Sequence, residues 1–220
     1  MPKINIAIDG PAGSGKTTIG KILAERINYH FIDSGLFYRY FAKNCWDNNL
    51  NYKEKEKVVE FCFQQTQDII QDPTSFFQLL EKQRITLNQP EIGKLASHFA
   101  TILELREMIY QIVRKIVISK GFVVGGRDIT FKVLPKAEVK VFLTADLVIR
   151  AQRRYQQLKI TSEGKIKLAE VEAELIERDQ RDRNNILAAE KSSLRVDTSN
   201  FSLAESVEKI YNLYLKKINN

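Results

Sequence analysis

The chain has 220 residues, 44% of them apolar and 28% charged, which fits a globular protein with one core or a core and a smaller appendage. No apolar run is long enough to span a bilayer, the first residues lack the pattern of a signal peptide, and Cys45 and Cys62 alone do not suggest a disulfide framework or a zinc site, so we expect a cytoplasmic protein. The net charge of +7 suits an anionic ligand. Because acidic residues are mixed with the basic ones between Arg150 and Arg183, we expect a small phosphorylated ligand, and neither a nucleic acid nor a membrane.

Short apolar runs typical of buried strands recur along the chain. They lie at residues 4–8, 30–32, 122–124, 139–143 and 194–196. The first segment with helical periodicity follows residue 16, where the spacing predicts one buried helix face formed by Ile19, Ile22, Leu23 and Ile27. Further helices are expected over residues 92–119 and 202–217. This alternation predicts an α/β fold with a parallel sheet flanked by helices on both faces.

Two stretches interrupt the alternation. Residues 46–91 are polar and indicate an inserted subdomain, whereas residues 155–170 contain an internal glycine and no clear strand, which favours a mobile flap before a helix. We therefore expect a single domain over the 220 residues. Its core is predicted to comprise residues 1–45, 92–150 and 184–220.

Residues 10–18 read GPAGSGKTT and match the phosphate-binding pattern G-x-x-x-x-G-K-[ST] in full. Glycines allow backbone N–H groups to turn inward around a phosphate, and the following helix directs its positive end to the same anion. Lys16 then reaches the β- and γ-phosphates, and the Thr17 hydroxyl coordinates Mg²⁺. Because an apolar strand precedes the loop and a helix follows it, we expect a nucleoside triphosphate to bind here. The residues expected to bind it are Gly10, Pro11, Ala12, Gly13, Ser14, Gly15, Lys16, Thr17 and Thr18.

Phosphoryl transfer to a small molecule requires a second anion site facing the first, and a lid that excludes water. Two motifs place suitable side chains at strand ends. In IDSGLFYR, Asp33 and Ser34 leave a predicted strand and Arg39 lies in the next helix. In VVGGRDI, Arg127 and Asp128 directly follow a buried strand, at the edge where open α/β sheets bind ligands.

A third motif, ERDQRDRNN, is expected to be helical. A continuous helix would place Arg178, Asp182 and Asn185 on one face. Taken alone, this pattern also fits an exposed helix face with several salt bridges.

Together these motifs resemble the bacterial cytidylate kinase family, nucleoside monophosphate kinases that make CDP and dCDP from CMP and dCMP. The resemblance covers nearly the whole chain and rests on the ordered motifs IAIDGPAGSGKTT, FIDSGLFYR, LAS…LR, VVGGRD, VFLTA, RAQRRYQQL and ERDQRDRN. It implies a phosphate-loop NTPase-type core, a monophosphate-binding insert at about 46–91 and a mobile lid at about 150–183. It also implies ATP as phosphoryl donor and Mg²⁺ as cofactor.

The resemblance further implies roles for matching residues. The positions that hydrogen-bond the acceptor's sugar correspond to Ser34, Asp128 and Asp182. The positions that bind its phosphate, where guanidinium groups suit the geometry, correspond to Arg39, Arg127 and Arg178. Those that contact the cytosine correspond to Ser97 and Arg106.

The lid, in which at least one arginine should contact the transferred phosphoryl group, corresponds to the segment with Arg150, Arg153 and Arg154. A water bound to Mg²⁺ is expected at Asp33. The residues expected to act in catalysis are Lys16, Arg127, Arg154 and Arg178.

The chain departs from the family pattern at three points. Asn185 stands where the family commonly has a base-recognising arginine, Gly125 where it has an acidic residue, and Thr130-Phe131 where it has Gly-Thr. Loss of one base-recognising donor weakens selection between cytosine and uracil by about 1–3 kcal/mol. Base selectivity is therefore expected to be less secure than the reaction.

The leading hypothesis is an ATP-dependent CMP and dCMP kinase. The alternatives are a broader pyrimidine kinase acting on UMP and CMP, another small-molecule phosphate-loop kinase, or a non-catalytic nucleotide- or RNA-binding protein. Direct attack by the acceptor phosphate requires no general base, so we assign no catalytic role to His30 or His98. We expect a monomer, because no long apolar surface element is evident.

Overall fold

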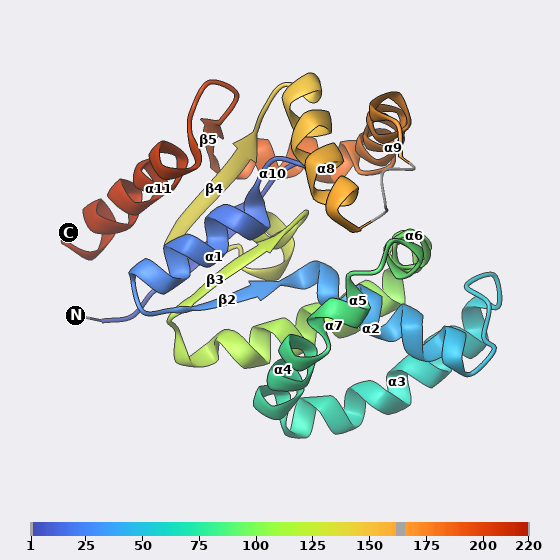
Figure 1. Cartoon of the computed structure of the whole chain (residues 1–220). Helices are drawn as coiled ribbons and strands as arrows, with labels where there is room; N and C mark the ends of the chain where they lie inside the picture. Colours follow the sequence, from blue (N-terminus) through green and yellow to red (C-terminus); the bar gives the residue numbers. More distant parts are fainter. Residues whose placement is uncertain (1, 162–165, 220) are drawn as a thin grey trace. The chain divides into compact units, whose positions relative to one another are not determined.

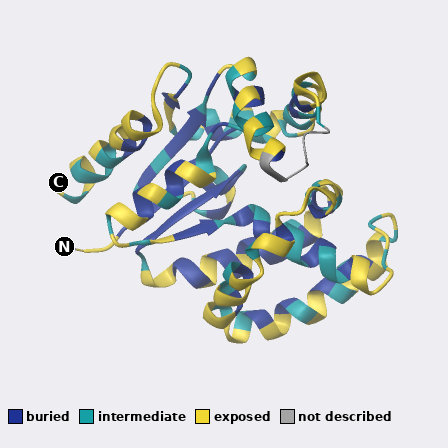
Figure 2. Cartoon of the chain, viewed as in Figure 1, coloured by how far each residue is buried: buried dark blue, intermediate teal, exposed yellow. Residues whose placement is uncertain are grey.

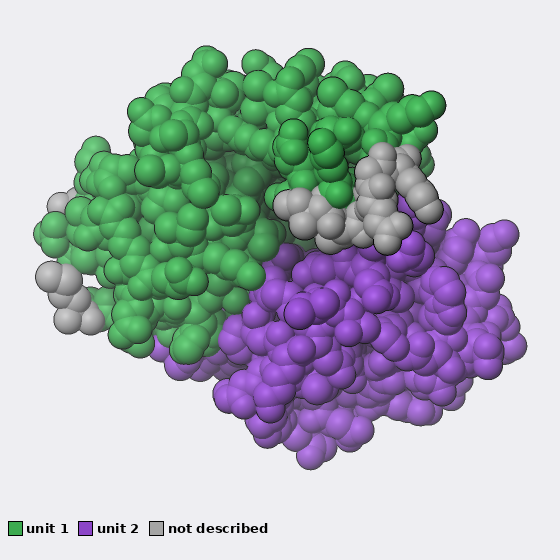
Figure 3. All heavy atoms as spheres, viewed as in Figure 1, with its two compact units in different colours: residues 1–32, 120–220 green, residues 33–119 purple. Residues whose placement is uncertain are grey.

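The computed structural model describes residues 2–161 and 166–219 (Figure 1). The chain forms two compact units, shown in different colours in Figure 3: residues 1–32 with 120–220, here called the sheet unit, and residues 33–119, here called the helical unit. The predicted insert, 46–91, lies inside the helical unit. The predicted boundaries of insert and lid remain predictions.

A five-stranded sheet of order β2-β3-β1-β4-β5 forms the centre of the sheet unit. Its strands are β1 (Asn5–Asp9), β2 (His30–Asp33), β3 (Phe122–Gly126), β4 (Val139–Thr144) and β5 (Leu194–Asp197). β1 pairs in parallel with β3 and β4, and β4 pairs in parallel with β5. Every strand predicted from the sequence is present, which confirms the α/β fold.

Helices cover the sheet, so that strands β1 and β3 are buried along their whole length, as their dark blue colour in Figure 2 shows. Those of the sheet unit are α1 (Lys16–Arg26), α8 (Leu147–Thr161), α9 (Leu168–Arg181), α10 (Arg183–Ser192) and α11 (Leu203–Ile218), together with a π-helical turn, η2 (Ile129–Val133). Alternate residues of β1, Ile6 and Ile8 among them, pack against α1 and α11. The intervening residues of β1, Asp9 included, therefore lie on the opposite face.

The helical unit consists of helices joined by short connections. They are α2 (Ser34–Asp47), α3 (Lys55–Gln71), α4 (Pro73–Lys82), α5 (Arg84–Leu87), α6 (Pro90–Phe99), α7 (Leu103–Ile116) and a 3₁₀ turn, η1 (Val117–Ser119). Side chains such as Phe37, Phe41, Phe99 and Leu105 are fully buried, so this unit has its own apolar core despite the polar sequence of its middle part.

The single helix predicted over residues 92–119 is wrong. The chain leaves the helix after Phe99 and re-enters it at Leu103. The break is stable because Arg106 donates from Nη1 to the Ala100 carbonyl at 3.1 Å, which satisfies an oxygen at the helix end. Ile102, at the same break, is buried.

The continuous helix predicted over residues 177–185 is also wrong. α9 ends before Asp182 and α10 begins after it, so Asp182 forms the junction. Its carboxylate lies 2.8 Å from Arg127, and aspartate has low helix propensity, so a break here is favoured.

Two smaller expectations also need correction. Ile22, predicted to lie on the buried face of the first helix, is 37% exposed. α1 instead turns Gly20 toward the core of the sheet unit, where a Cβ on Gly20 would lie 2.3 Å from the Phe31 ring. Within the predicted flap at 155–170, residues 155–161 belong to α8 and 168–170 to α9, while residues 162–165 lie outside the described part.

Candidate active site

The phosphate loop connects β1 to α1, as predicted, and its shape depends on glycine. Gly10 has a φ of 154°, and a Cβ there would lie 2.0 Å from the Leu143 carbonyl oxygen, so no other residue fits. Gly15 has a φ of 93° immediately before α1. The Lys16 ammonium donates to the carbonyls of Gly10 and Pro11, each at 2.7 Å, and so lies against the loop.

Helices α8 and α9 hold the loop through Ala12. Arg150 donates from Nη1 to the Ala12 carbonyl at 3.0 Å and to Asp179 Oδ2 at 2.6 Å, while Asp179 Oδ1 accepts from the Ala12 N–H at 3.4 Å. Arg150 is only 7% exposed, and its Nε donates to the Ala145 carbonyl. Its role is therefore to fix the loop.

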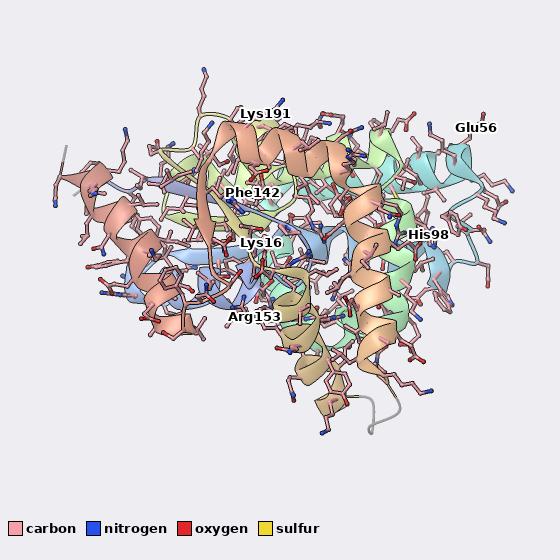
Figure 4. The ribbon with its side chains drawn as sticks, turned by 90° about the horizontal axis from the view of Figure 1, so that it is seen from above. Lys16, Glu56, His98, Phe142, Arg153 and Lys191 are labelled. Atoms are coloured by element: carbon pink, nitrogen blue, oxygen red, sulfur yellow. The ribbon has the colours of Figure 1, made fainter. Side chains whose placement is uncertain are left out.

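Arg153 also has partners in the protein. Arg153, labelled in Figure 4, donates to both the hydroxyl and the carbonyl of Thr198, directly after β5, at 3.0 and 2.8 Å. Arg154 is the third arginine placed in the predicted lid. Its positive charge acts on Arg178.

Arg127, Arg154 and Arg178 form a cluster of like charges in the sheet unit. Burial, followed by the positive charges of Arg127 and Arg154, lowers the pKa of Arg178 to about 10, although Glu174 and Asp182 oppose the effect. Burial also lowers the pKa of Arg154. Excess positive charge therefore lies around Arg178, and an anion bound there would relieve it.

The position of Arg127 is set by β3. Its Nη1 lies 2.8 Å from Asp182 Oδ2, yet among the described residues no acceptor meets this buried nitrogen in hydrogen-bonding geometry. In the sheet Asp9 pairs with Gly126, so Gly10 and Arg127 both leave their strands at the same edge. The structure thus brings the phosphate loop and Arg127 to the carboxyl end of the sheet, where ligands bind in open α/β folds.

The other predicted residues of the sheet unit lie near these. Asp128 follows Arg127 and is 3% exposed, and Asp182 joins α9 to α10 beside Arg127. Asn185 is half-buried in the first turn of α10. A Cβ on Gly125 would lie 3.9 Å from Lys16 Cβ. The acidic side chain usual at this position in the family is therefore absent beside Lys16.

The remaining predicted residues belong to the helical unit. Asp33 accepts from the Gly35 N–H at 3.0 Å and so caps α2, whose first residue is the buried Ser34. Arg39, on α2, donates to the Leu87 carbonyl at 3.3 Å and to the Asn88 side chain.

The two residues predicted to contact the base lie on α6 and α7. The Ser97 hydroxyl donates to the Lys94 carbonyl at 2.6 Å. Arg106 donates to the Tyr110 hydroxyl at 2.9 Å, in addition to the Ala100 carbonyl. His98, beside Ser97 (Figure 4), stacks on Tyr52 with ring centroids 4.5 Å apart.

Sequence reasoning missed four residues that hold the predicted ones in place. Asp179 and Asn88 fix Arg150 and Arg39, and Asp9 and Thr130 join β1 to the segment after β3. Burial raises the pKa of Asp9, although hydrogen bonds from Thr130 and Ile129 oppose the effect. The one available signal was the position of Asp9, an acid inside an apolar run directly before the loop.

The fold and the phosphate loop define a phosphate-loop NTPase-type core. A shikimate kinase from Acinetobacter baumannii shares the fold, with a TM-score of 0.50 and 18% identity over 97% of this chain and 94% of that one. A shikimate kinase from Bacteroides thetaiotaomicron also shares the fold, with a TM-score of 0.50 and 15% identity over 96% of this chain and 98% of that one. At these identities the likeness shows the fold alone.

The sequence comparisons are more specific. A model of the cytidylate kinase family matches residues 6–216. A cytidylate kinase of Caldicellulosiruptor saccharolyticus is 36% identical over all of this chain and 99% of its own length. A cytidylate kinase of Mycoplasmopsis synoviae is 34% identical over 96% of this chain and 98% of its own length. The chain belongs to the cytidylate kinase family. No helix among the described residues is both long and apolar enough to cross a membrane.

Proposed function

We propose that the protein transfers the γ-phosphoryl group of ATP to the phosphate of CMP and dCMP, giving CDP or dCDP and ADP. The observation that carries the proposal is the pairing, in one compact unit, of a complete phosphate loop with a half-buried cluster of three arginines. Phosphoryl transfer needs positioning and spread-out positive charge, and these features supply both. Membership of the cytidylate kinase family supports the choice of acceptor.

The donor binds along residues 10–18. Backbone N–H groups of the loop and the N-terminus of α1 surround its phosphates, and Lys16 moves from the loop carbonyls to the β- and γ-oxygens. The Thr17 hydroxyl is an oxygen ligand of the kind Mg²⁺ prefers, and Asp33 would hold a water bound to that ion. Bound Mg²⁺ would neutralise charge that develops on the phosphate oxygens.

The roles proposed for the acceptor's contacts follow the motif matches. Arg39, Arg127 and Arg178 bind its phosphate, and Arg154 contacts the transferred group. The sugar is held by Ser34, Asp128 and Asp182, and the cytosine is read by Ser97 and Arg106, with Asn185 in place of the more usual arginine. Support for these roles comes from the motif matches and, in the sheet unit, from the charge on the arginine cluster.

The reaction is an in-line displacement. An oxygen of the acceptor phosphate forms a bond to the γ-phosphorus as the bond to the β,γ-bridging oxygen breaks, and ADP leaves. The attacking oxygen is already ionised near neutral pH, since the second pKa of such a phosphate is about 6. No general base is needed, and we propose that the protein acts as a cytoplasmic monomer with a lid over about 150–183.

A coupled ADP-release assay with Mg·ATP and CMP, dCMP, UMP or AMP tests the proposal. Turnover with CMP and dCMP is expected. If Ser97 and Arg106 contact the base as proposed, kcat/KM for UMP should be at least about tenfold lower than for CMP. Lys16→Met, purified in the same way, controls for contaminating kinases and should be inactive. Equal turnover of UMP would indicate a broader pyrimidine kinase, and no turnover of any acceptor would overturn the proposal.

A further inference from the structure

Asp9 is a fully buried carboxylate directly before the phosphate loop. Its Oδ1 accepts from the Ile129 N–H at 3.0 Å, and its Oδ2 accepts from both the N–H and the hydroxyl of Thr130, each at 2.7 Å. Both residues begin η2, the π-helical turn that follows Arg127 and Asp128. The side chain thus bonds to a segment 120 residues further along the chain.

The position of this contact in the sheet is well defined. Asp9 pairs with Gly126 of β3 and with Phe142 of β4, the latter labelled with Lys16 in Figure 4. Asp9 is covalently joined to Gly10, the first glycine of the loop, and Thr130 lies only three residues after Arg127. The contact therefore joins the start of the proposed donor site to the turn directly after Arg127, a proposed acceptor arginine.

The Thr130 hydroxyl has a second neighbour. Its Oγ1 lies 3.1 Å from the Ser192 hydroxyl at the end of α10, which in turn donates to the Ala189 carbonyl. Thr130 donates its one hydroxyl proton to Asp9, so it can only accept from Ser192, whose own single proton has the Ala189 carbonyl as its alternative acceptor.

We infer that Asp9 and Thr130 are positioning residues that fix the distance between the phosphate loop and Arg127, and so the alignment of donor and acceptor phosphates. The inference rests on the proposed function. Neither side chain touches a substrate; they act through the two turns that do. In-line transfer is sensitive to such alignment, since a displacement of about 1 Å lowers a rate by roughly 10²-fold.

Thr130→Val tests the inference, because it removes the hydroxyl, with its bond to Asp9 and its contact with Ser192, and keeps the side-chain shape and the N–H bond to Asp9. We expect kcat to fall about 10- to 100-fold. The KM values and the separately measured dissociation constants of ATP and CMP should stay within about twofold, because each half-site is intact. Thr130→Ser, which restores the hydroxyl, should restore kcat.

The matched control is Ser192→Ala, which removes the other neighbour of the Thr130 hydroxyl and leaves Asp9 bonded. It should keep kcat. Asp9→Asn provides a second test, since the amide cannot accept at both positions and kcat should fall with unchanged substrate affinities. If Asp9→Asn does not fold, Thr130→Val alone decides.

Three results would overturn the inference. They are a Thr130→Val enzyme with reduced thermal stability and unchanged kcat, a rise in KM at constant kcat, or an equal loss of kcat in Ser192→Ala. Wild-type protein is assayed alongside. A wild type that phosphorylates no nucleotide would overturn the proposed function and the inference with it, whereas an active wild type with an equally active Thr130→Val would overturn the inference alone.

Discussion

The two units hold their candidate substrate-binding arginines in opposite ways. In the sheet unit, Arg127 and Arg154 are close enough to Arg178 to disfavour its positive charge. In the helical unit, Arg39 and Arg106 donate to neutral oxygens, namely a carbonyl and a side-chain amide for the first and a carbonyl and a phenol for the second.

This difference assigns different tasks to the two sets. A half-buried cluster of like charges gains most when a phosphate dianion enters, so we expect the sheet unit to supply attraction and transition-state charge. Hydrogen bonds to neutral acceptors fix the direction of a guanidinium, so we expect the helical unit to supply orientation and selection. Variants that remove charge and variants that remove orientation should therefore differ in size and in the kinetic constant affected.

The largest effect is expected for Arg178→Gln. Loss of this half-buried guanidinium, proposed to bind the acceptor phosphate, should lower kcat/KM for CMP about 10²- to 10³-fold. The thermal midpoint should hold or rise, because the substitution removes repulsion from Arg127 and Arg154. Steady-state kinetics and thermal unfolding of the same preparations measure the two effects.

Arg181→Gln is the matched control for this variant. Arg181 lies on the same helix but is exposed, and its ion pair with Glu177 is long at 3.7 Å. Its kinetics should match those of the wild type. If Arg178→Gln kept full kcat/KM while losing stability, the cluster would be structural and the comparison between the units would fail.

A smaller effect is expected where an arginine loses only its orientation. Asn88→Ala leaves Arg39 charged but removes the amide that holds it. The KM for CMP should rise about fivefold, from a loss of roughly 1 kcal/mol, with kcat and the KM for ATP within about twofold. Asn88→Asp should raise the KM further, because a carboxylate would compete with the acceptor phosphate for Arg39.

Asn48→Ala is the control, since Asn48 is exposed and its side-chain amide donates to the Asn44 carbonyl at the end of α2. It should leave all kinetic constants unchanged. A KM for CMP that is the same in Asn88→Ala and wild type would mean that Arg39 needs no such support.

The elements of the sheet unit were predictable because their signals are local. The phosphate loop is a contiguous pattern, and each strand is a short apolar run bounded by polar residues or glycine. The same holds for Arg127 and Asp128, which a strand end places at the edge of the sheet. Such features depend on spacing, which a sequence displays directly.

The contacts that position these features were not predictable, since they join distant segments. Arg39 and Asn88 are 49 residues apart, and Asp9 and Thr130 are 121 apart. Arg150 has the sequence context of a lid arginine, yet tertiary packing buries it against Ala12. The helix break near Ala100 likewise depends on a side chain six residues away, and helical periodicity continues through it.

The smallest effects concern ion pairs remote from the site, one in each unit. Glu138 in the sheet unit accepts from the Asn5 N–H at 2.8 Å and from Lys120 Nζ at 2.7 Å, and its side chain is 26% exposed. Burial raises the pKa of Glu138, but the bonds from Lys120 and the Asn5 N–H outweigh it, so the pKa lies below its ordinary value. In the helical unit the pair of Glu104 and Lys55, 2.9 Å apart, is about half exposed on both sides.

Because the folded pKa of Glu138 is depressed, its stabilisation is present above the ordinary glutamate pKa and is lost as pH falls through the folded value. Glu138→Gln should lower the free energy of unfolding by about 1 kcal/mol at neutral pH, and the difference should shrink in acid. Hydrogen bonding to Lys55 also lowers the pKa of Glu104, yet water screens that exposed pair, so Glu104→Gln should show no measurable change. Urea unfolding of both variants at neutral and acidic pH measures this, and equal losses in the two variants would show that the Asn5 contact adds nothing to the sheet unit.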